Sequence, residues 1–200
     1  MDIRSIIAPT VTDLNTLEEF IESLHDLAPS IEKDVSRLKN APDDRDILGN
    51  LFRSMHNIKG DATLCRVELA VAIAHPIETV LARLRNGEIT FSDILAEAVL
   101  LAIDRLELAV ESLRASRPLE NLRLLALVQE LERLAESPPS AIKTCASDLI
   151  EAVTGFRPIG EAATLGRRRT QSSIHRSSAQ TSDTASPVAP ARPVRPMRCT

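Results

Sequence analysis

The chain has 200 residues, of which 44% are hydrophobic and 2% aromatic, and its formal net charge is −4 at pH 7. This length allows one well-buried domain with an appendage and excludes two large domains. Because Trp and Tyr are absent while Leu, Ala, Ile and Glu dominate, the composition favours helices packed through aliphatic side chains, and we expect an all-α fold.

The first helical pattern runs from about residue 13 to 39 and the second from about 44 to 63, judged by apolar residues spaced near 3.6 positions. Pro29 should kink the first helix or split it in two, because proline lacks the N–H of an interior helical hydrogen bond. A turn at 40–43 supplies a new N-cap before the second helix. The apolar stripes are Phe20, Leu24, Leu27, Ile31, Val35 and Leu38 in the first helix, and Leu48, Leu51, Phe52, Met55 and Ile58 in the second.

A third helix is predicted from about 67 to 86, and Gly87 takes the C′ position that commonly ends helices. Ser92 caps a fourth helix, Pro118 opens a fifth that reaches about residue 136, and a short sixth follows to about 153. The third and fourth stripes are Leu69, Ile73, Ile77, Val80 and Leu84, then Leu95, Ala98, Ala102, Leu106, Ala109 and Leu113. Because short connections join these amphipathic helices, an antiparallel bundle is the expected architecture.

We expect three parts along the chain. Residues 1–116 form an antiparallel four-helix bundle, and 117–156 add two helices that pack on or beside it, either capping the bundle or pairing between chains. Residues 157–200 are rich in Arg, Ser and Pro with few large apolar residues, which predicts a disordered basic tail. Nucleic acid or an anionic membrane would bind only through this tail, and we favour a solvated tail instead.

The cysteines do not indicate a structural framework. Cys65, Cys145 and Cys199 are widely spaced without a CxxC pair, which predicts neither disulfides nor a zinc ribbon. No segment approaches the ~20 apolar residues needed to span a bilayer, and the N-terminal residues turn acidic before forming a signal-peptide core. We therefore expect a cytoplasmic protein.

The segment around His56 contains the candidate functional residues. His56, Lys59 and Gly60 share one face of the second helix with Arg53 one turn earlier and Gly49 two turns earlier. This face is polar, basic and bare, and we expect Arg53, Gly60 and Gly49 to contact a partner. A helical glycine costs about 1 kcal/mol relative to alanine. Close approach of another backbone would explain Gly60; the alternative is that Gly60 begins to end the helix.

His75 and Glu78 lie off the apolar stripe of the third helix. If the second and third helices are antiparallel, Glu78 can sit beside His56, where its carboxylate would hold one imidazole nitrogen and leave the other unprotonated as a nucleophile. Lys59 would neutralise charge on an incoming phosphoryl group. A metal site built from His56, His75, Cys65 and Glu78 would need a convergence that the spacing does not impose, so we expect no metal. His25, among apolar residues, is expected to be partly buried and structural.

Together these residues resemble the histidine-phosphotransfer (HPt) domains, and most closely the N-terminal phosphoryl-accepting domain of chemotaxis-type histidine kinases. The family core, a His followed three residues later by Lys-Gly and a small-residue stretch, is similar to His56, Lys59, Gly60 and Ala62 here. A second His and a Glu follow at the matching spacings as His75 and Glu78, leading into the segment 84–88. The resemblance covers about residues 13–114. Asp61, Arg66 and Pro76 depart from the family pattern, and a kink at Pro76 would move Glu78.

The resemblance implies that His56 is the phosphorylated residue, Glu78 its hydrogen-bond partner, and Lys59 and His75 the neighbours that tune it. It implies a phosphocarrier that receives the group from a histidine kinase or a receiver-domain aspartate and passes it to a response regulator, with no cofactor. Nothing in the sequence resembles a P-loop or an ATP lid, so ATP cleavage is expected on a partner. The alternative is a non-catalytic module that binds a receiver or kinase through the same face.

Overall fold

The computed structural model describes residues 13–158, which lie in the first of the chain's two compact units, Met1–Ala163. Within these residues the secondary structure is entirely helical, which confirms the all-α prediction. The elements are α2 (Leu14–Leu38), α3 (Arg45–Leu64), α4 (Glu68–Arg85), α5 (Asp93–Arg114), the short 3₁₀ helix η1 (Glu120–Leu122), α6 (Leu124–Glu136) and α7 (Ile142–Thr154).

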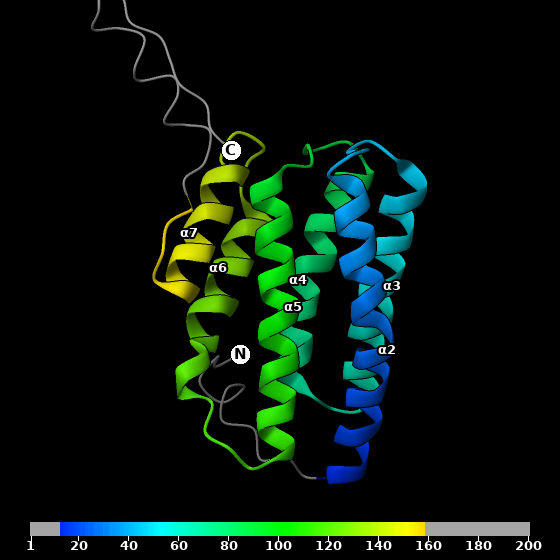
Figure 1. The fold of residues 1–200 in the computed structure, drawn as a ribbon, viewed down its shortest axis with the longest axis vertical. Coiled ribbons are helices and arrows are strands. Elements are labelled where there is room, and N and C mark those ends of the chain that lie inside the picture. Colours follow the sequence, from blue (N-terminus) through cyan, green and yellow to red (C-terminus); the bar gives the residue numbers. More distant parts are fainter. Residues whose placement is uncertain (1–12, 159–200) are drawn as a thin grey trace, which may run out of the picture. The chain divides into compact units, whose positions relative to one another are not determined.

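The helices pack in three layers of two (Figure 1). Helices α2 and α3 form one layer, α4 and α5 the middle one, and α6 and α7 the third. The first two layers make the predicted four-helix bundle. The two additional helices pack on it within the chain, since α6 contacts α4 and α7 contacts α5.

The middle layer explains why α4 and α5 are buried on more than one side. Helix α4 buries its predicted stripe and also Ala70, Ala74 and Leu81, because α3 and α6 both lie against it. Helix α5 likewise buries Ala96, Val99, Ile103 and Val110 in addition to most of its predicted stripe. A single 3.6-residue stripe describes a helix with one covered face, so it could not reveal the second covered face of these two helices.

The boundaries of α3 and α4 follow local capping rules. The Asp44 side chain accepts hydrogen bonds from the backbone N–H groups of Asp46 and Ile47 at the start of α3. Gly87, with φ +75°, ends α4 as predicted. Its N–H donates to the carbonyl of Leu84, and the N–H of Glu88 donates to that of Arg83, a pairing that satisfies the last carbonyls of the helix. Both ends of the helix pair that carries the candidate site are therefore well defined.

The predicted split of the first helix at Pro29 and the predicted helix start at Pro118 were wrong. Helix α2 runs through the exposed Pro29 without a break, because buried residues on both sides, such as Leu24 and Ile31, hold it against the core. Pro118 does not open the fifth helix: η1 intervenes, and α6 starts only after Arg123, whose φ of 52° is left-handed. The Arg123 side chain donates a hydrogen bond to the carbonyl of Ala152 near the end of α7. Local sequence rules could not predict this contact, because its partners are far apart in the sequence.

The remaining sequence predictions concern the ends of the chain. The predicted basic tail at 157–200, except for Arg157 and Pro158, lies outside the described residues, and so does Cys199. Arg157 pairs with Asp148 and Glu151 of α7. Of the helices between residues 13 and 158, none is long and apolar enough to cross a membrane.

One buried guanidinium joins the third layer to the middle one. The Arg83 side chain, 15% exposed, donates to the carbonyls of Ala135 and Ser137 at 2.8 and 2.7 Å. These carbonyls lie at the C-terminal end of α6, where helical hydrogen bonding runs out and a cation is favourable.

We predict that Arg83→Ala lowers the free energy of unfolding by about 2 kcal/mol, because it removes two hydrogen bonds to a charged group and leaves carbonyls unpaired. Arg114→Ala is the matched control: Arg114 is half exposed and pairs with Glu111 one turn earlier, so about 0.5 kcal/mol or less is expected. Urea denaturation of both variants measures the difference, and equal small losses would show that Arg83 does not anchor α6.

Candidate functional site

A buried carboxylate joins two basic side chains on the outer side of the α3–α4 pair. Nδ1 of His56 donates a hydrogen bond of 2.6 Å to Oε1 of Glu78. The ammonium of Lys59 pairs with the other oxygen, Oε2. The His56 side chain is 59% exposed and that of Glu78 only 11%, so the carboxylate forms the floor of the site and the imidazole its open surface.

This arrangement follows from the antiparallel packing of α3 and α4. His56 and Lys59 are three residues apart on α3 and face the same direction. Glu78 lies in the middle of α4, which stays helical from Glu68 to Arg85 although it contains Pro76. The displacement of Glu78 that a kink at Pro76 would cause does not occur, because Pro76 is itself buried within a helix held on both sides.

The charge state of Glu78 determines the tautomer of His56. Burial raises the pKa of the Glu78 carboxyl, but the hydrogen bonds and charges of Lys59 and His56 outweigh burial and hold it below its ordinary value. Glu78 is therefore ionised near neutral pH and can only accept hydrogen bonds. In the neutral imidazole the single proton must then lie on Nδ1, which leaves the lone pair of Nε2 free.

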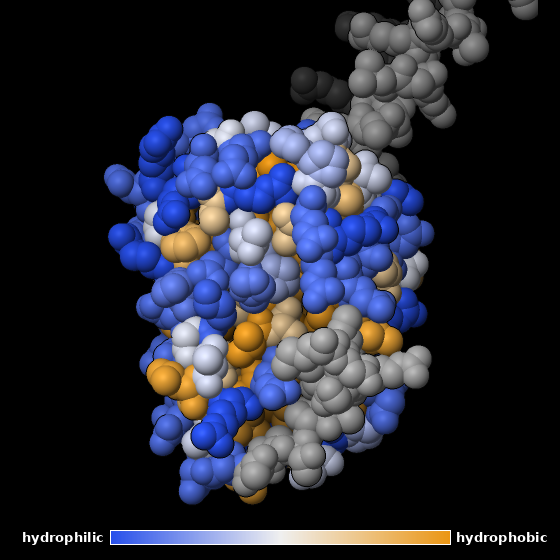
Figure 2. Space-filling model, turned by 180° about the vertical axis from the view of Figure 1, so that it is seen from behind, coloured by the Kyte–Doolittle hydropathy of each residue, from blue (hydrophilic) through white to orange (hydrophobic). Residues whose placement is uncertain are grey.

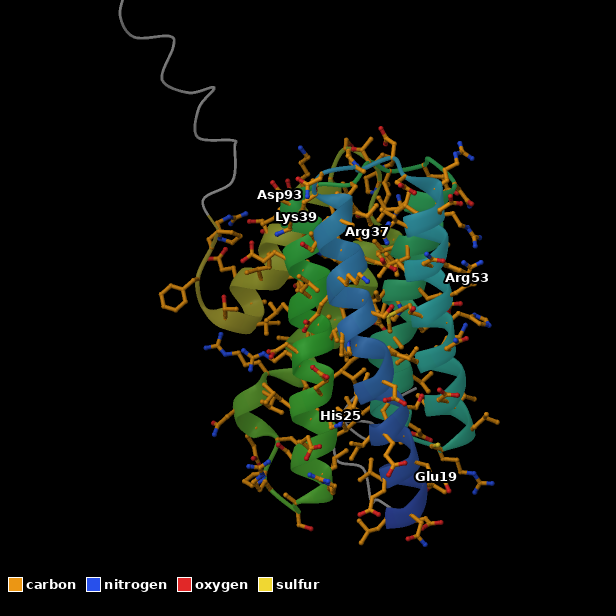
Figure 3. The ribbon with its side chains drawn as sticks, turned by 45° about the vertical axis from the view of Figure 1, so that its right-hand side comes forward. Glu19, His25, Arg37, Lys39, Arg53 and Asp93 are labelled. Atoms are coloured by element: carbon orange, nitrogen blue, oxygen red, sulfur yellow. The ribbon has the colours of Figure 1, made fainter. Side chains whose placement is uncertain are left out.

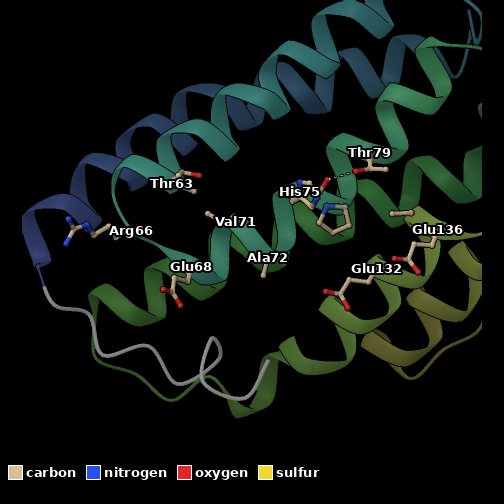
Figure 4. Close-up of a pocket in the computed structure, with 12 residues that line it drawn as sticks. Thr63, Arg66, Glu68, Val71, Ala72, His75, Thr79, Glu132 and Glu136 are labelled. Atoms are coloured by element: carbon tan, nitrogen blue, oxygen red, sulfur yellow. Dashed lines mark hydrogen bonds between the residues drawn. The ribbon is translucent and has the colours of Figure 1, made fainter. Parts of the chain in front are cut away.

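His75 is exposed on α4 and is not part of the hydrogen-bonded group of His56, Lys59 and Glu78. Its side chain lines a cavity of about 690 Å³ bounded by the end of α3, the first half of α4 and the end of α6. Figure 4 shows His75 there with Val71 and Ala72 of α4, opposite Glu132 and Glu136 of α6. Figure 2, which shows the molecule from the side opposite to Figure 1, has a largely hydrophilic described surface with apolar side chains in its lower half. Among residues 13–158, His75 has no side-chain hydrogen bond to His56, Lys59 or Glu78.

Two of the positions that depart from the family pattern have structural roles. Asp61 accepts a hydrogen bond from the hydroxyl of Ser23 on α2, so its carboxylate is bound within the bundle instead of facing the imidazole. Arg66, in the turn between α3 and α4, has a φ of 57°. A left-handed conformation suits glycine better than arginine, so Arg66 adopts this turn at a conformational cost.

The face of α3 around His56 is open. Among residues 13–158, a Cβ added to Gly49 or Gly60 would meet nothing within 4 Å, so close approach of another segment of this range does not explain Gly60. Gly60 itself is helical and lies about one turn before α3 ends at Leu64, so the alternative that it begins to end the helix stays open. Arg53 is exposed, contacts Asn50 and projects outward from α3 (Figure 3).

The sequence interpretation missed one neighbour of His56. Phe52, assigned to the buried stripe, is half buried, and its ring lies beside that of His56 with the guanidinium of Arg85 over it. The signal was the four-residue spacing from Phe52 to His56, which puts the two rings on one face.

Two other predicted residues stand apart from the site. His25, expected to be partly buried, is half exposed, with Nε2 3.6 Å from Oε1 of Glu111 (Figure 3). Burial, with the charges of Glu19 and Asp61, raises the pKa of the Cys65 thiol, which disfavours a reactive thiolate. In the described part of the chain, no three His, Cys, Asp or Glu side chains are grouped so as to hold a metal ion.

Comparison with known proteins gives one consistent family. The model of the Hpt domain matches residues 15–137. The chain is 29% identical over 98 residues to the sensor histidine kinase CheAY of Helicobacter pylori, covering 49% of this chain and 12% of that protein. It is 25% identical over 150 residues to the chemotaxis protein CheA of Rhizobium meliloti, covering 74% and 20%, and 29% identical over 103 residues to CheA of Bacillus subtilis, covering 50% and 15%.

The chain thus spans at most 20% of the length of these three relatives. No solved structure matches it. The family match runs from the first turn of α2 to the end of α6 and includes both helices that carry His56, Lys59 and Glu78. The chain therefore belongs to the Hpt domain family, the histidine-phosphotransfer modules of two-component signalling, which are phosphocarriers and not catalytic kinase domains.

Proposed function

We propose that this protein accepts a phosphoryl group on Nε2 of His56 and passes it to an aspartate of a response regulator. The donor is the active site of a histidine kinase or the aspartyl phosphate of a receiver domain. The observation that carries the proposal is the hydrogen bond from Nδ1 of the exposed His56 to the buried Glu78, because it leaves Nε2 unprotonated at the surface.

The transfer exchanges one bond at phosphorus for another. The lone pair of Nε2 attacks phosphorus in line with the bond to the leaving oxygen, and the new N–P bond forms as that P–O bond breaks. The leaving oxygen keeps the bonding electron pair, either as the aspartate carboxylate of a receiver or as the terminal phosphate oxygen of ADP on a kinase. No proton leaves His56 during the attack, since Nε2 carries none.

Glu78 and Lys59 serve this step by balancing charge. Attack gives the imidazole ring positive charge, and the Glu78 carboxylate stabilises that charge through the proton it holds on Nδ1. The Lys59 ammonium has three N–H donors, and its pairing with Oε2 of Glu78 keeps it beside the imidazole, where a compact cation suits phosphoryl oxygens. We propose that His75 tunes the site only indirectly, because its side chain lines the neighbouring cavity.

We predict that purified protein incubated with an active histidine kinase and ATP, or with a phosphorylated receiver, gains an acid-labile phosphate that mass spectrometry maps to His56. His56→Gln should abolish it, while His25→Gln, a half-exposed histidine on α2, should label like the wild type. Equal labelling of wild type and His56→Gln would contradict the proposal. Binding of a receiver by His56→Gln, with no phosphate on any histidine of the wild type, would instead identify a non-catalytic interaction module.

The depressed pKa of Glu78 predicts an acid-dependent stability. A carboxyl whose pKa is lower in the folded than in the unfolded chain stabilises the fold above the unfolded pKa, and this contribution is lost as pH falls through the folded pKa. The difference in unfolding free energy between wild type and Glu78→Gln should therefore be constant near neutral pH and shrink in the acid range below the ordinary carboxyl pKa.

Urea denaturation across that range measures the difference. Glu97→Gln, which changes an exposed carboxylate on α5, is the matched control and should show no comparable convergence. A Glu78→Gln difference that stays constant down to the lowest pH would show that the ionised carboxylate contributes nothing to the folded state.

Because Gly60 is open, we predict that Gly60→Ala has opposite effects on the stability of the fold and on the rate of phosphoryl transfer. Gly60→Ala should raise the free energy of unfolding by up to about 1 kcal/mol, because alanine favours the helix and its methyl group meets no neighbour. The same methyl group stands on the face that we propose a partner covers, so transfer from a phosphorylated receiver should slow. Labelling by phosphoramidate, a small donor with no docking surface, should be unchanged, and equal slowing with both donors would rule out a docking effect.

A further inference from the structure

The hydrogen bond to Glu78 holds the imidazole of His56 along only one edge. Because the side chain is 59% exposed, much of its surface has no packing partner. A single hydrogen bond leaves the ring free to tilt about the line from Nδ1 to Oε1. The lone pair of Nε2 lies in the ring plane, so a tilt changes the direction from which this nitrogen can attack phosphorus, and in-line transfer depends on that direction.

The ring of Phe52 restricts this tilt. Phe52 precedes His56 by one helical turn on α3, and their ring centroids are 6.1 Å apart with an interplanar angle of 20°. This separation is within the range in which offset, nearly parallel rings attract each other. Phe52 is only half buried, so the core does not by itself hold its ring in place.

The guanidinium of Arg85 covers the same phenyl ring. Its central carbon lies 4.0 Å from the centroid of Phe52, the geometry of a cation–π interaction. Arg85 belongs to the last turn of α4, and helical side chains lean toward the N-terminus of their helix, which directs this side chain back along α4. The contact therefore joins the end of α4 to the middle of α3.

The contact with Phe52 is the polar or charged side-chain interaction that the described residues give Arg85. Within residues 13–158 its side chain makes no ion pair or hydrogen bond, whereas Arg83, two residues earlier, holds two carbonyls of the α6 end. The contact with Phe52 is thus what keeps the Arg85 guanidinium at this place.

We propose that Phe52 and Arg85 are positioning residues that set the plane of the His56 imidazole for phosphoryl transfer, Phe52 directly and Arg85 through Phe52. The proposal rests on the proposed function of His56. It adds to the hydrogen bond with Glu78 a second restraint on the imidazole, which acts through the Phe52 ring and requires no contact between Arg85 and the phosphoryl group.

Phosphorylation kinetics with phosphoramidate test the proposal without a protein partner. Phe52→Leu should slow labelling of His56 by roughly tenfold, since small misplacements of reacting groups have effects of this order or larger. Phe52→Tyr retains the ring and should restore a rate near that of the wild type. Arg114→Ala, which removes a half-exposed guanidinium far along α5, is the control for loss of charge and should label normally. A wild-type rate for Phe52→Leu would overturn the proposal.

A double-mutant cycle separates positioning from direct contact with phosphate. If Arg85 acts through Phe52, Arg85→Ala slows labelling in the wild-type background and has no further effect in the Phe52→Leu background. If the two effects instead multiply in full, Arg85 acts independently of the ring, and its assignment as a positioning residue is wrong. Circular dichroism of each variant shows that the bundle remains folded.

Nuclear magnetic resonance of the imidazole distinguishes a failure of this inference from a failure of the proposed function. The ring current of Phe52 should shift the resonances of the carbon-bound imidazole protons of His56, which are assigned by their loss in His56→Gln. Both Phe52→Leu and Arg85→Ala should reduce this ring-current shift. Unchanged chemical shifts in Phe52→Leu would show that Phe52 does not stack on His56, whether or not His56 is phosphorylated. If the ring-current shift is present but no donor phosphorylates wild-type His56, only the proposed function is refuted.

Discussion

A single carboxylate, that of Glu78, determines the chemistry of the surface above it. Its two oxygens accept hydrogen bonds from His56 and Lys59, and its burial makes both contacts stronger than they would be in water. An ionised acceptor at Nδ1 requires the proton there and leaves the lone pair of Nε2 free. The carboxylate beneath the ring thus selects which imidazole nitrogen carries the proton.

The position of that carboxylate depends on the middle layer of the fold. Helix α4 lies between α3 and α6, and buried residues on two of its sides prevent the shift that Pro76 would otherwise allow. Arg83 ties the end of α6 to α4 from the other side. Helix α6 therefore supports the helix that carries Glu78, while the face of α3 around His56 stays uncovered within the described residues.

The imidazole of His56 is contacted from the core side and from along α3, while its outer side stays open. Glu78 acts from below through hydrogen bonding, and Phe52 from the side through its ring. The bare glycines at 49 and 60 leave the outer surface open. The imidazole therefore combines internal restraint with external access, as the proposed transfer to a protein partner requires.

Sequence reasoning alone predicted the helical class, most helix boundaries and the placement of His56 and Lys59 on one helix face, because helical periodicity, caps and i, i+3 spacing are local properties of the chain. It also identified Glu78 as a partner, on the condition that α3 and α4 are antiparallel. Only the tertiary structure decided that Pro29 leaves α2 unbroken, that His75 lines a cavity beside α6, that Asp61 bonds to Ser23 and that Arg85 covers Phe52. Each of these depends on side chains from helices distant in the sequence, and no local pattern records which faces of those helices meet.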